Sequence, residues 1–379
     1  MTRFALAFVI LCAGALSARA QDAANCGAPA KLDDGWTTVT PAEAGFDPVH
    51  LCALDKFISQ WKGANVHGVV VVRHGKLVME RYYSGPDERL GRPLGTIDFG
   101  PKVKHDLRSV SKSVTSLLIG IAIGEGKFPS LDSPLVDHLP AKYDELRTPE
   151  NSRISMRNLL TMSSGMKWDE TPPYTDPSNS WNDMDGAADP YRFLLQRAVV
   201  TTPGTVYNYN SGDTELLGLA LMHGTGGHID DYARERLFAP LGITDFDWIK
   251  MWSSGEPYAS AGVRLRPRDM AKLGQLLLND GRWEGKQVLP KGWAAESVRP
   301  RLNGDGLFYY GYQWWLGRTM LRGRDLHWAA GTGLGGQRLY VQPDLGLVVV
   351  VTAGHYSSPL QVPVPFGIFT KHVLPATID

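Results

Sequence analysis

The sequence predicts a mixed α/β (α+β) protein whose sheet is assembled from both ends of the chain and whose middle forms an all-α lobe. Strand-like stretches lie near both ends, stretches with helical periodicity lie between them, and no linker, charge block or repeat divides the chain. We therefore expect one domain over residues 21–379, with the sheet body at about 40–105 and 300–379 and the helical lobe at about 106–299. A cleft between body and lobe is the natural place for a site.

The first predicted elements are two strands, residues 66–73 and 76–83, which are rich in β-branched and aromatic residues. His74 and Gly75 separate them, and a two-residue connection of this kind predicts a tight hairpin.

Helical spacing recurs in the middle of the chain, in residues 110–123, 216–222, 232–237 and 270–278. Gly124, Gly242 and Gly281 are the expected helix stops. Strands are predicted again near the C-terminus, at residues 309–316, 337–341 and 345–352. A turn at Pro343 and Asp344 joins the last two.

The composition is that of an ordinary globular protein. Apolar residues make up 43% of the chain, and 39 Lys and Arg residues balance 39 Asp and Glu residues. Balanced charge without a run rich in Lys and Arg argues against nucleic-acid binding. We therefore expect no nucleic-acid partner.

Residues 1–20 have the features of a secretory signal peptide. Arg3 precedes an apolar run over residues 4–16, and Ala18-Arg19-Ala20 is a small-x-small cleavage signature. The run is shorter than the roughly 20 residues that span a bilayer, so we expect no membrane span. We expect cleavage after Ala20 and a periplasmic or secreted mature protein, with 37 basic and 39 acidic residues once Arg3 and Arg19 are removed.

Of the three cysteines, Cys12 leaves with the signal peptide. Cys26 and Cys52 then form an even pair in an oxidising compartment, and the sequence leaves both a disulfide and two unpaired thiols open. No Cys or His cluster has the spacing of a zinc site, and HExxH does not occur. The sequence therefore predicts no metal.

The pattern S-x-x-K occurs three times, beginning at Ser59, Ser109 and Ser164. Only Ser109 follows an irregular polar stretch, residues 101–108, and opens a long apolar helix. Three positions along a helix place Lys112 on the same face as Ser109. A serine is activated when a base takes its proton, and a lysine can be that base only when neutral, a form that burial favours. The helix N-terminus adds backbone N–H groups that favour a developing oxyanion.

We therefore predict that Ser109 is the nucleophile and Lys112 its base. The alternative is that Ser109 is a helix N-cap and Lys112 a solvated cation in the first turn. Ser59 and Ser164 are interpreted as a helix-surface residue and a turn residue, without chemistry.

A second motif is the loop 203–212, which precedes the helical run 215–220. The Tyr209 hydroxyl on such a loop can transfer protons if the fold brings it against the Ser109 and Lys112 pair. The alternative is a packing tyrosine that is hydrogen-bonded to the backbone.

The third motif is a glycine-rich stretch. Residues 331–336 match G-x-G-x-x-G, but a dinucleotide site needs a helix after the loop, whereas the strand 337–341 follows here. We reject a dinucleotide site. Glycines beside a cleft allow close backbone approach and a free N–H for an oxyanion hole; a flexible turn at a sheet edge is the alternative.

In this order and at these separations, the motifs resemble the serine β-lactamase/penicillin-binding-protein superfamily. The chain is most similar to its β-lactamase-related serine hydrolases: class C-like enzymes, family VIII esterases and 6-aminohexanoate-dimer hydrolases. The resemblance covers roughly residues 66–354. It is carried by LRSVSKS at 107–113, NLLTMSSG at 158–165, PGT at 203–205 with Tyr209, PLGI at 240–243 and GGQ at 335–337.

This resemblance implies a β-lactamase/transpeptidase-like fold, with an antiparallel sheet flanked by helices, and an acyl-enzyme mechanism without a cofactor. Ser109 would attack a carbonyl while Lys112 and Tyr209 share the proton transfers. The backbone N–H of Ser109 and one from the Gly333-Leu334 segment would hold the oxyanion.

The sequence departs from the β-lactamase pattern at two places. Ser211 stands where β-lactamases have asparagine, and 330–332 reads Ala-Gly-Thr in place of Lys-Thr/Ser-Gly. The missing strand lysine would have bound a substrate carboxylate, so esters or amides that lack an essential carboxylate are favoured. Five tryptophans are candidates to line an apolar acyl pocket, with core packing as the alternative: Trp168, Trp181, Trp314, Trp315 and Trp328. His327 and His355 are interpreted as structural.

The leading hypothesis is an exported serine hydrolase that cleaves a small-molecule ester or amide through Ser109. A class C-type β-lactamase or DD-peptidase is the alternative within the enzymes. A non-catalytic ligand-binding module with a penicillin-recognising fold is the alternative of another class. The sequence indicates no oligomeric state.

Overall fold

A computed structural model describes residues 26–378, so the expected signal peptide and Cys12 lie outside the described residues. Within this range a nine-stranded sheet forms the body, in the order β1-β3-β2-β16-β15-β14-β13-β12-β11. Its strands are β1 (Thr37–Thr38), β2 (Val66–Arg73), β3 (Lys76–Tyr82), β11 (Leu302–Asn303), β12 (Tyr309–Tyr310), β13 (Trp315–Leu321), β14 (Arg324–Gly333), β15 (Gln337–Gln342) and β16 (Leu347–Ala353). Every neighbouring pair is antiparallel except β1 and β3, which confirms the predicted fold class.

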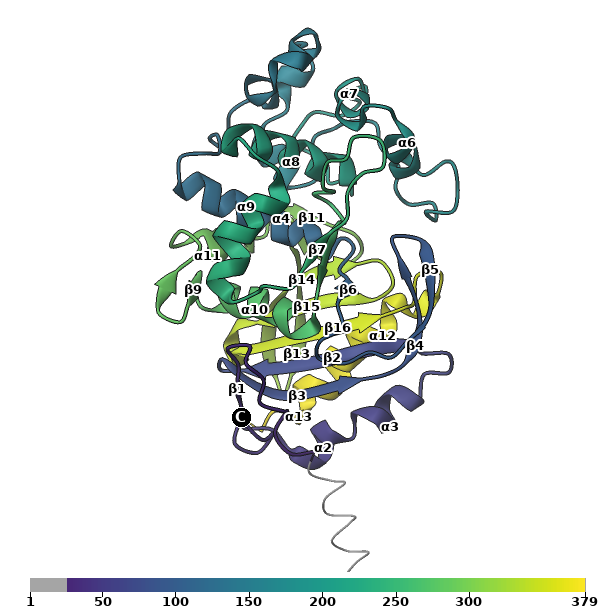
Figure 1. The fold of residues 1–379 in the computed structure, drawn as a ribbon, viewed down its shortest axis with the longest axis vertical. Coiled ribbons are helices and arrows are strands. Elements are labelled where there is room, and N and C mark those ends of the chain that lie inside the picture. Colours follow the sequence, from purple (N-terminus) through teal and green to yellow (C-terminus); the bar gives the residue numbers. More distant parts are fainter. Residues whose placement is uncertain (1–25, 379) are drawn as a thin grey trace, which may run out of the picture.

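The two ends of the chain meet within the sheet, where β2 pairs with β16 (Figure 1). Val70 and Val72 of β2 belong to one hydrophobic core, whereas Val69 and Val71 belong to the core on the opposite face. Helices cover both faces, so β2 and β16 are buried at every position rather than at alternate ones.

One face of the sheet is covered by α10 (Pro267–Leu278), whose Met270, Leu273 and Leu276 share a core with Val70 and Val72. The elements on the other face are α2 (Pro48–Cys52), α3 (Leu54–Ser59), α12 (Pro363–Gly367), the π-helix Ile368–Val373 and α13 (Leu374–Ala376).

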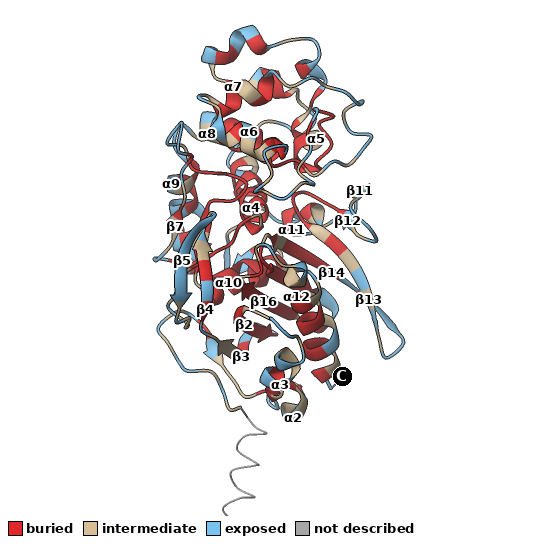
Figure 2. Cartoon of the chain, turned by 90° about the vertical axis from the view of Figure 1, so that its right-hand side faces the viewer, coloured by how far each residue is buried: buried red, intermediate tan, exposed pale blue. Residues whose placement is uncertain are grey.

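The helical lobe lies at the top of Figure 1. It contains α5 (Met156–Leu160), α6 (Ser180–Gly186), α7 (Pro190–Leu195), α8 (Ser211–Thr225) and α9 (Ile229–Ala233). Helix α4 (Val110–Gly124) contacts α8 of the lobe and β14 of the sheet. It is therefore buried along nearly its whole length (Figure 2), which explains its apolar sequence.

Residues 106–299 are not all lobe, which differs from the expected boundary. The C-terminal part of this range returns to the sheet as α10 and α11 (Trp293–Ser297). A small sheet of β6 (His105–Asp106), β8 (Val263–Leu265) and β7 (Asp247–Trp248) joins the two parts, and β9 (Arg282–Trp283) pairs with β10 (Lys286–Gln287). This part of the chain belongs to the body because the apolar side of α10 is buried against the sheet.

The hairpin predicted at His74 and Gly75 is confirmed, with positive φ angles of 49° and 76° at the two turn residues. The stretch 309–316 is not one strand, because the chain bends at Gln313, where φ is 64°. Strand β14 and the hairpin of β4 (Gly85–Arg89) and β5 (Arg92–Ile97) were not predicted, since β14 carries glycines and charges and β5 is almost entirely exposed.

Cys26 and Cys52 form a disulfide, with Cα atoms 5.4 Å apart, which ties the N-terminal arm to α2. Of the two alternatives left open by the sequence, the structure therefore contains the bridge. Among the described residues, no helix combines the length and apolar character needed to cross a membrane.

Candidate active site

Ser109 lies between β6 and the first turn of α4, at the junction of sheet body and lobe. Its side chain makes no capping hydrogen bond to α4, so the N-cap interpretation does not account for its hydroxyl. The residue before it, Arg108, has a φ of 51°, in the left-handed region that is unfavourable for a side-chain-bearing residue. Arg108 is held there by a 2.6 Å ion pair with Glu88 and by the ring of Tyr356, 4.9 Å away.

Lys112 is brought against Ser109 by one turn of helix. Its Nζ donates to Ser109 Oγ at 3.0 Å and to the Ser260 carbonyl at 3.2 Å. The side chain is buried, so it is not the solvated cation of the alternative interpretation. Its Nζ also lies 5.0 Å from the centre of the Tyr209 ring. The fold therefore assembles Ser109, Lys112 and Tyr209 in one place.

Tyr209 is held by its neighbours on the loop that leads into α8. The next residue, Asn210, caps α8 by accepting from the backbone N–H of Asp213. The Tyr209 ring stacks on Trp315 of β13, with ring centres 6.1 Å apart. These contacts keep the tyrosine ring beside Lys112.

Gly331 and Gly333 lie on β14 where this strand faces the start of α4. A Cβ on Gly333 would lie 2.3 Å from the Leu107 carbonyl oxygen, and one on Gly331 would lie 2.9 Å from Val110. Only glycine allows this approach, which brings Leu334 to the same cavity as Ser109. The glycines connect two antiparallel strands, β14 and β15, which agrees with the rejection of a dinucleotide site.

A cavity of about 840 Å³ lies between lobe and body, as expected from the sequence. Ser109 and Leu334 lie on its wall together with residues of three other segments. The lobe contributes Glu170, Thr171, Pro172, Pro173, Tyr174, Thr175, Trp181 and Ser211; the β4–β5 hairpin contributes Glu88, Leu90 and Gly91; the C-terminal segment contributes Tyr356, Ser357, Ser358, Pro359 and Gln361. Arg108 and Ala261 complete the lining.

Two buried or half-buried carboxylates near the site were missed by the sequence analysis. Glu170 on the cavity wall accepts from Ser211 Oγ at 2.6 Å, from Ser211 N at 2.8 Å, from Tyr174 Oη at 2.5 Å and from Trp168 Nε1 at 2.8 Å. It thus fixes the chain at Ser211, where β-lactamases have asparagine. No local pattern identifies Glu170, because Ser211 is 41 positions away.

The second carboxylate is Glu215 of α8, which is fully buried. It accepts the backbone N–H groups of Ala259 and Ser260, at 3.0 and 2.9 Å. Burial raises the pKa of Glu215, while the hydrogen bonds to Ser260 and the nearby Lys112 oppose that shift. Glu215 therefore positions the Ser260 carbonyl that accepts from Lys112.

The tryptophans divide between cavity and core. Trp181 lines the cavity, and Trp315 stacks on Tyr209. Trp168, Trp314 and Trp328 are buried. Among the two histidines interpreted as structural, His327 is exposed beside Asp325, and His355 accepts from the backbone N–H of Asn65.

A serine hydrogen-bonded to a buried lysine at a helix N-terminus, on an antiparallel sheet flanked by helices, defines the class of S-x-x-K serine hydrolases. The pattern of the family described as "Beta-lactamase" matches residues 55–359, so the chain belongs to the β-lactamase family. It is a β-lactamase-related serine hydrolase, and hydrolases of this family cleave amide or ester bonds.

Two relatives and one solved structure are similar to the chain. It is 26% identical over 303 residues to the 6-aminohexanoate-dimer hydrolase of Paenarthrobacter ureafaciens, covering 74% of this chain and 70% of that one. It is 28% identical to the lovastatin esterase of Penicillium rubens, over 46% of each chain. The penicillin binding protein of Bacillus halodurans has the same fold, with a TM-score of 0.59 and 21% identity over 79% of this chain and 94% of that one.

Proposed function

We propose that the chain is an exported hydrolase that cleaves a small-molecule ester or amide through an acyl-enzyme on Ser109. The observation that carries this proposal is the 3.0 Å hydrogen bond between Lys112 Nζ and Ser109 Oγ at the wall of the cavity. The buried Lys112 side chain holds its amine against the serine hydroxyl, which is the position that a general base for Ser109 requires.

In the first step Ser109 Oγ attacks the substrate carbonyl carbon while its proton passes to Lys112 Nζ. The tetrahedral intermediate collapses when the bond to the leaving group breaks, and the leaving oxygen or nitrogen takes a proton through Tyr209 and Lys112. Water then attacks the Ser109 ester, loses its proton to the same pair, and releases the acid and free Ser109.

The negative oxygen of each intermediate is stabilised by the backbone N–H groups of Ser109 and Leu334. Arg338 of β15 supports the second donor, because its Nη1 donates to the Gly333 carbonyl at 2.9 Å. That carbonyl and the Leu334 N–H belong to one trans peptide, so they point in opposite directions. Arg338 therefore turns the N–H away from itself and polarises the peptide, which makes Arg338 a positioning residue.

The cavity walls favour an uncharged, partly apolar acyl group. Pro172, Pro173 and Trp181 supply apolar surface, and Ala330 stands where the family's strand lysine would bind a substrate carboxylate. One relative is by name a dimer hydrolase and another an esterase, which supports an amide or ester substrate. A β-lactamase or DD-peptidase remains the second candidate, since the fold is shared with a penicillin binding protein.

Export is supported by the signal-peptide pattern of residues 1–20 and by the Cys26–Cys52 disulfide, which persists in oxidising compartments. We expect the mature chain to begin at Gln21 and to be periplasmic or secreted. N-terminal sequencing of the protein recovered from cell fractions checks this.

The function is tested by intact-mass spectrometry after treatment with a fluorophosphonate. We expect one adduct on the wild-type chain, none on Ser109→Ala, and labelling slowed by about 100-fold or more in Lys112→Met, in line with the loss of a general base. An unlabelled but folded wild type would contradict the nucleophile assignment and favour the binding module. Hydrolysis rates for p-nitrophenyl esters, anilides and nitrocefin then separate ester, amide and β-lactam substrates.

A further inference from the structure

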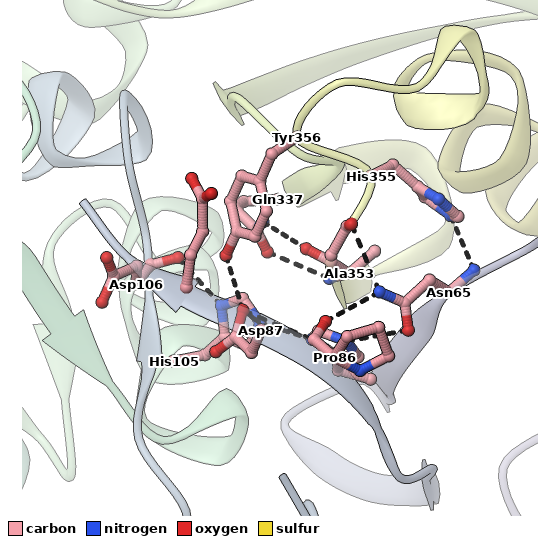
Figure 3. Close-up of polar contacts among 12 residues, drawn as sticks. Asn65, Pro86, Asp87, His105, Asp106, Gln337, Ala353, His355 and Tyr356 are labelled. Carbon is pink, nitrogen blue, oxygen red and sulfur yellow. Dashed lines mark hydrogen bonds and ion pairs between the residues drawn. The ribbon is translucent and has the colours of Figure 1, made fainter. Parts of the chain in front are cut away.

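A second polar cluster is buried beside the cavity, and the proposed hydrolysis does not use it. It consists of His67 on β2, Asp87 on β4 and His105 on β6, of which both histidines are fully buried and the Asp87 side chain is 2% exposed. Their potential ligand atoms all lie within 4.8 Å of one another. Among the described residues it is the single such group, and Figure 3 shows Asp87 and His105 beside Tyr356.

The outer nitrogens of the two imidazoles both face hydrogen-bond acceptors. His105 Nδ1 lies 3.0 Å from the Asp106 carbonyl oxygen, and His67 Nε2 lies 3.1 Å from Asn65 Oδ1. The Asn65 amide cannot be turned round, because its Nδ2 donates to the carbonyls of Pro86 and Gly354 (Figure 3). Both outer nitrogens must therefore carry the proton of their ring.

This assignment leaves two lone pairs facing each other. A neutral imidazole carries one proton, so His67 Nδ1 and His105 Nε2 are both acceptors, and they lie 2.8 Å apart. A cation must lie between them: either an extra proton shared by the rings, or a metal ion.

The geometry suits a metal ion. Asp87 Oδ1 lies 3.6 Å from His105 Nε2 and 3.9 Å from His67 Nδ1. A circle through three atoms separated by 2.8, 3.6 and 3.9 Å has a radius of about 2.0 Å, and zinc–nitrogen and zinc–oxygen bonds are about 2.0–2.2 Å long. A metal-bound histidine also donates its other N–H to an oxygen acceptor, as both rings do here.

We propose that His67 Nδ1, His105 Nε2 and Asp87 Oδ1 bind a divalent transition-metal ion of the zinc type, with solvent as a further ligand. The proposal departs from the sequence-based expectation of no metal, because the three ligands come from separate strands and have no motif spacing. It stands independently of the proposed hydrolysis.

The ion would act as a structural brace for the wall of the active cavity. His105 precedes Ser109 by four positions, and Asp87 is next to Glu88, the partner of the strained Arg108. Tyr356, which lines the cavity, donates to Asp87 Oδ1 at 2.8 Å. The site thus joins β2, the β4–β5 hairpin and the approach to Ser109.

The test measures metal on the tag-free, full mature chain. We expect elemental analysis and native mass spectrometry to find one zinc ion per chain after zinc supplementation, and calorimetric titration of the chelator-treated protein to find one site for Zn²⁺. Cobalt in the same site should give visible absorption bands. His67→Gln and Asp87→Asn should bind zinc about 100-fold more weakly or not at all. His372→Gln, which changes a buried histidine elsewhere, should bind normally.

The proposal is overturned if the folded wild-type chain shows neither stoichiometric zinc nor cobalt bands. The ring-nitrogen NMR spectrum then identifies the alternative, since a shared proton gives a third N–H on the His67 and His105 pair. Because the wild-type titration decides by itself, a variant that fails to fold leaves the test intact. None of these readings depends on hydrolase activity.

Discussion

At the scale of single residues, the geometry of the candidate site depends on two buried ionisable side chains, Lys112 and Glu215. Lys112 is removed from solvent and held between Ser109 Oγ and the Ser260 carbonyl. Glu215 holds that carbonyl's segment through two backbone N–H groups, so the base is positioned by a residue that never reaches the cavity wall. Such support is typical of sites in which a nucleophile and its base must keep a fixed geometry.

Arg338 gives a prediction at this scale. Arg338→Met should lower kcat about 10-fold with little change in KM, because the Leu334 N–H loses its alignment and polarisation while substrate contacts remain; complete loss of such a donor costs about 100- to 1,000-fold. Arg338→Lys, which retains one donor, should recover part of the loss. Steady-state kinetics and affinity for a boronic acid that mimics the tetrahedral intermediate measure both effects. If KM for the substrate rose by the same factor as the Kd for the boronic acid, the positioning role would be contradicted.

At the scale of elements, α4 and β14 decide where the chemistry can take place. Helix α4 is buried between lobe and sheet, so its N-terminus is fixed from both sides. Strand β14 can approach that N-terminus because Gly331 and Gly333 have no side chains. Strand β5, by contrast, is mostly exposed (Figure 2), whereas β4 carries the buried Asp87 next to Glu88 on the cavity wall.

Replacing Gly333 tests this approach. The Cβ of Gly333→Ala would lie 2.3 Å from the Leu107 carbonyl oxygen, so β14 must move away from α4 and carry Leu334 with it. We expect kcat/KM to fall by about 100-fold or more, as for a lost oxyanion donor. Gly100→Ala is the matched control, since its Cβ meets no atom within 4 Å and should leave the rate unchanged. Full activity in Gly333→Ala would exclude the close approach as a requirement.

At the scale of the whole molecule, the site exists because two distant ends of the chain share one sheet. Strands β2 and β16 pair within it, and the chain between them forms the lobe, then α10 on the sheet face, and then strands β11 to β15. The cavity therefore has one wall from each part, and unfolding either part removes the site.

Buried histidines make global stability depend on pH. Burial lowers the pKa of His372 and of His355 below the value of about 6.5 that a histidine has in the unfolded chain. The unfolded chain therefore binds more protons on acidification, so stability is full above pH 6.5 and is lost as the pH falls. Urea unfolding at pH 7.5 and pH 5 should show a smaller loss for His372→Gln than for the wild type. An identical loss would show that His372 does not contribute.

The sequence by itself determined the elements whose patterns are local. The β2–β3 hairpin follows from its valine-rich strands and the His74-Gly75 turn, and the Ser109 and Lys112 pair follows from helix geometry. The antiparallel sheet followed from the family resemblance, which rests on the order of the motifs in the sequence. Strands β4, β5 and β14 have no apolar periodicity, so the sequence does not predict them. Helix α10 would be amphipathic whether it packed on the sheet or in the lobe, so its sequence does not show that it returns to the sheet.

Only the tertiary structure decided which distant residues meet. Glu170 reaches Ser211 across 41 positions, and His67 reaches His105 across 38. The pairing of Cys26 with Cys52 was also open until their Cα atoms were placed 5.4 Å apart. The physical reason is common to all three: contacts between separate segments depend on how buried surfaces pack, and no local spacing along the chain records that packing.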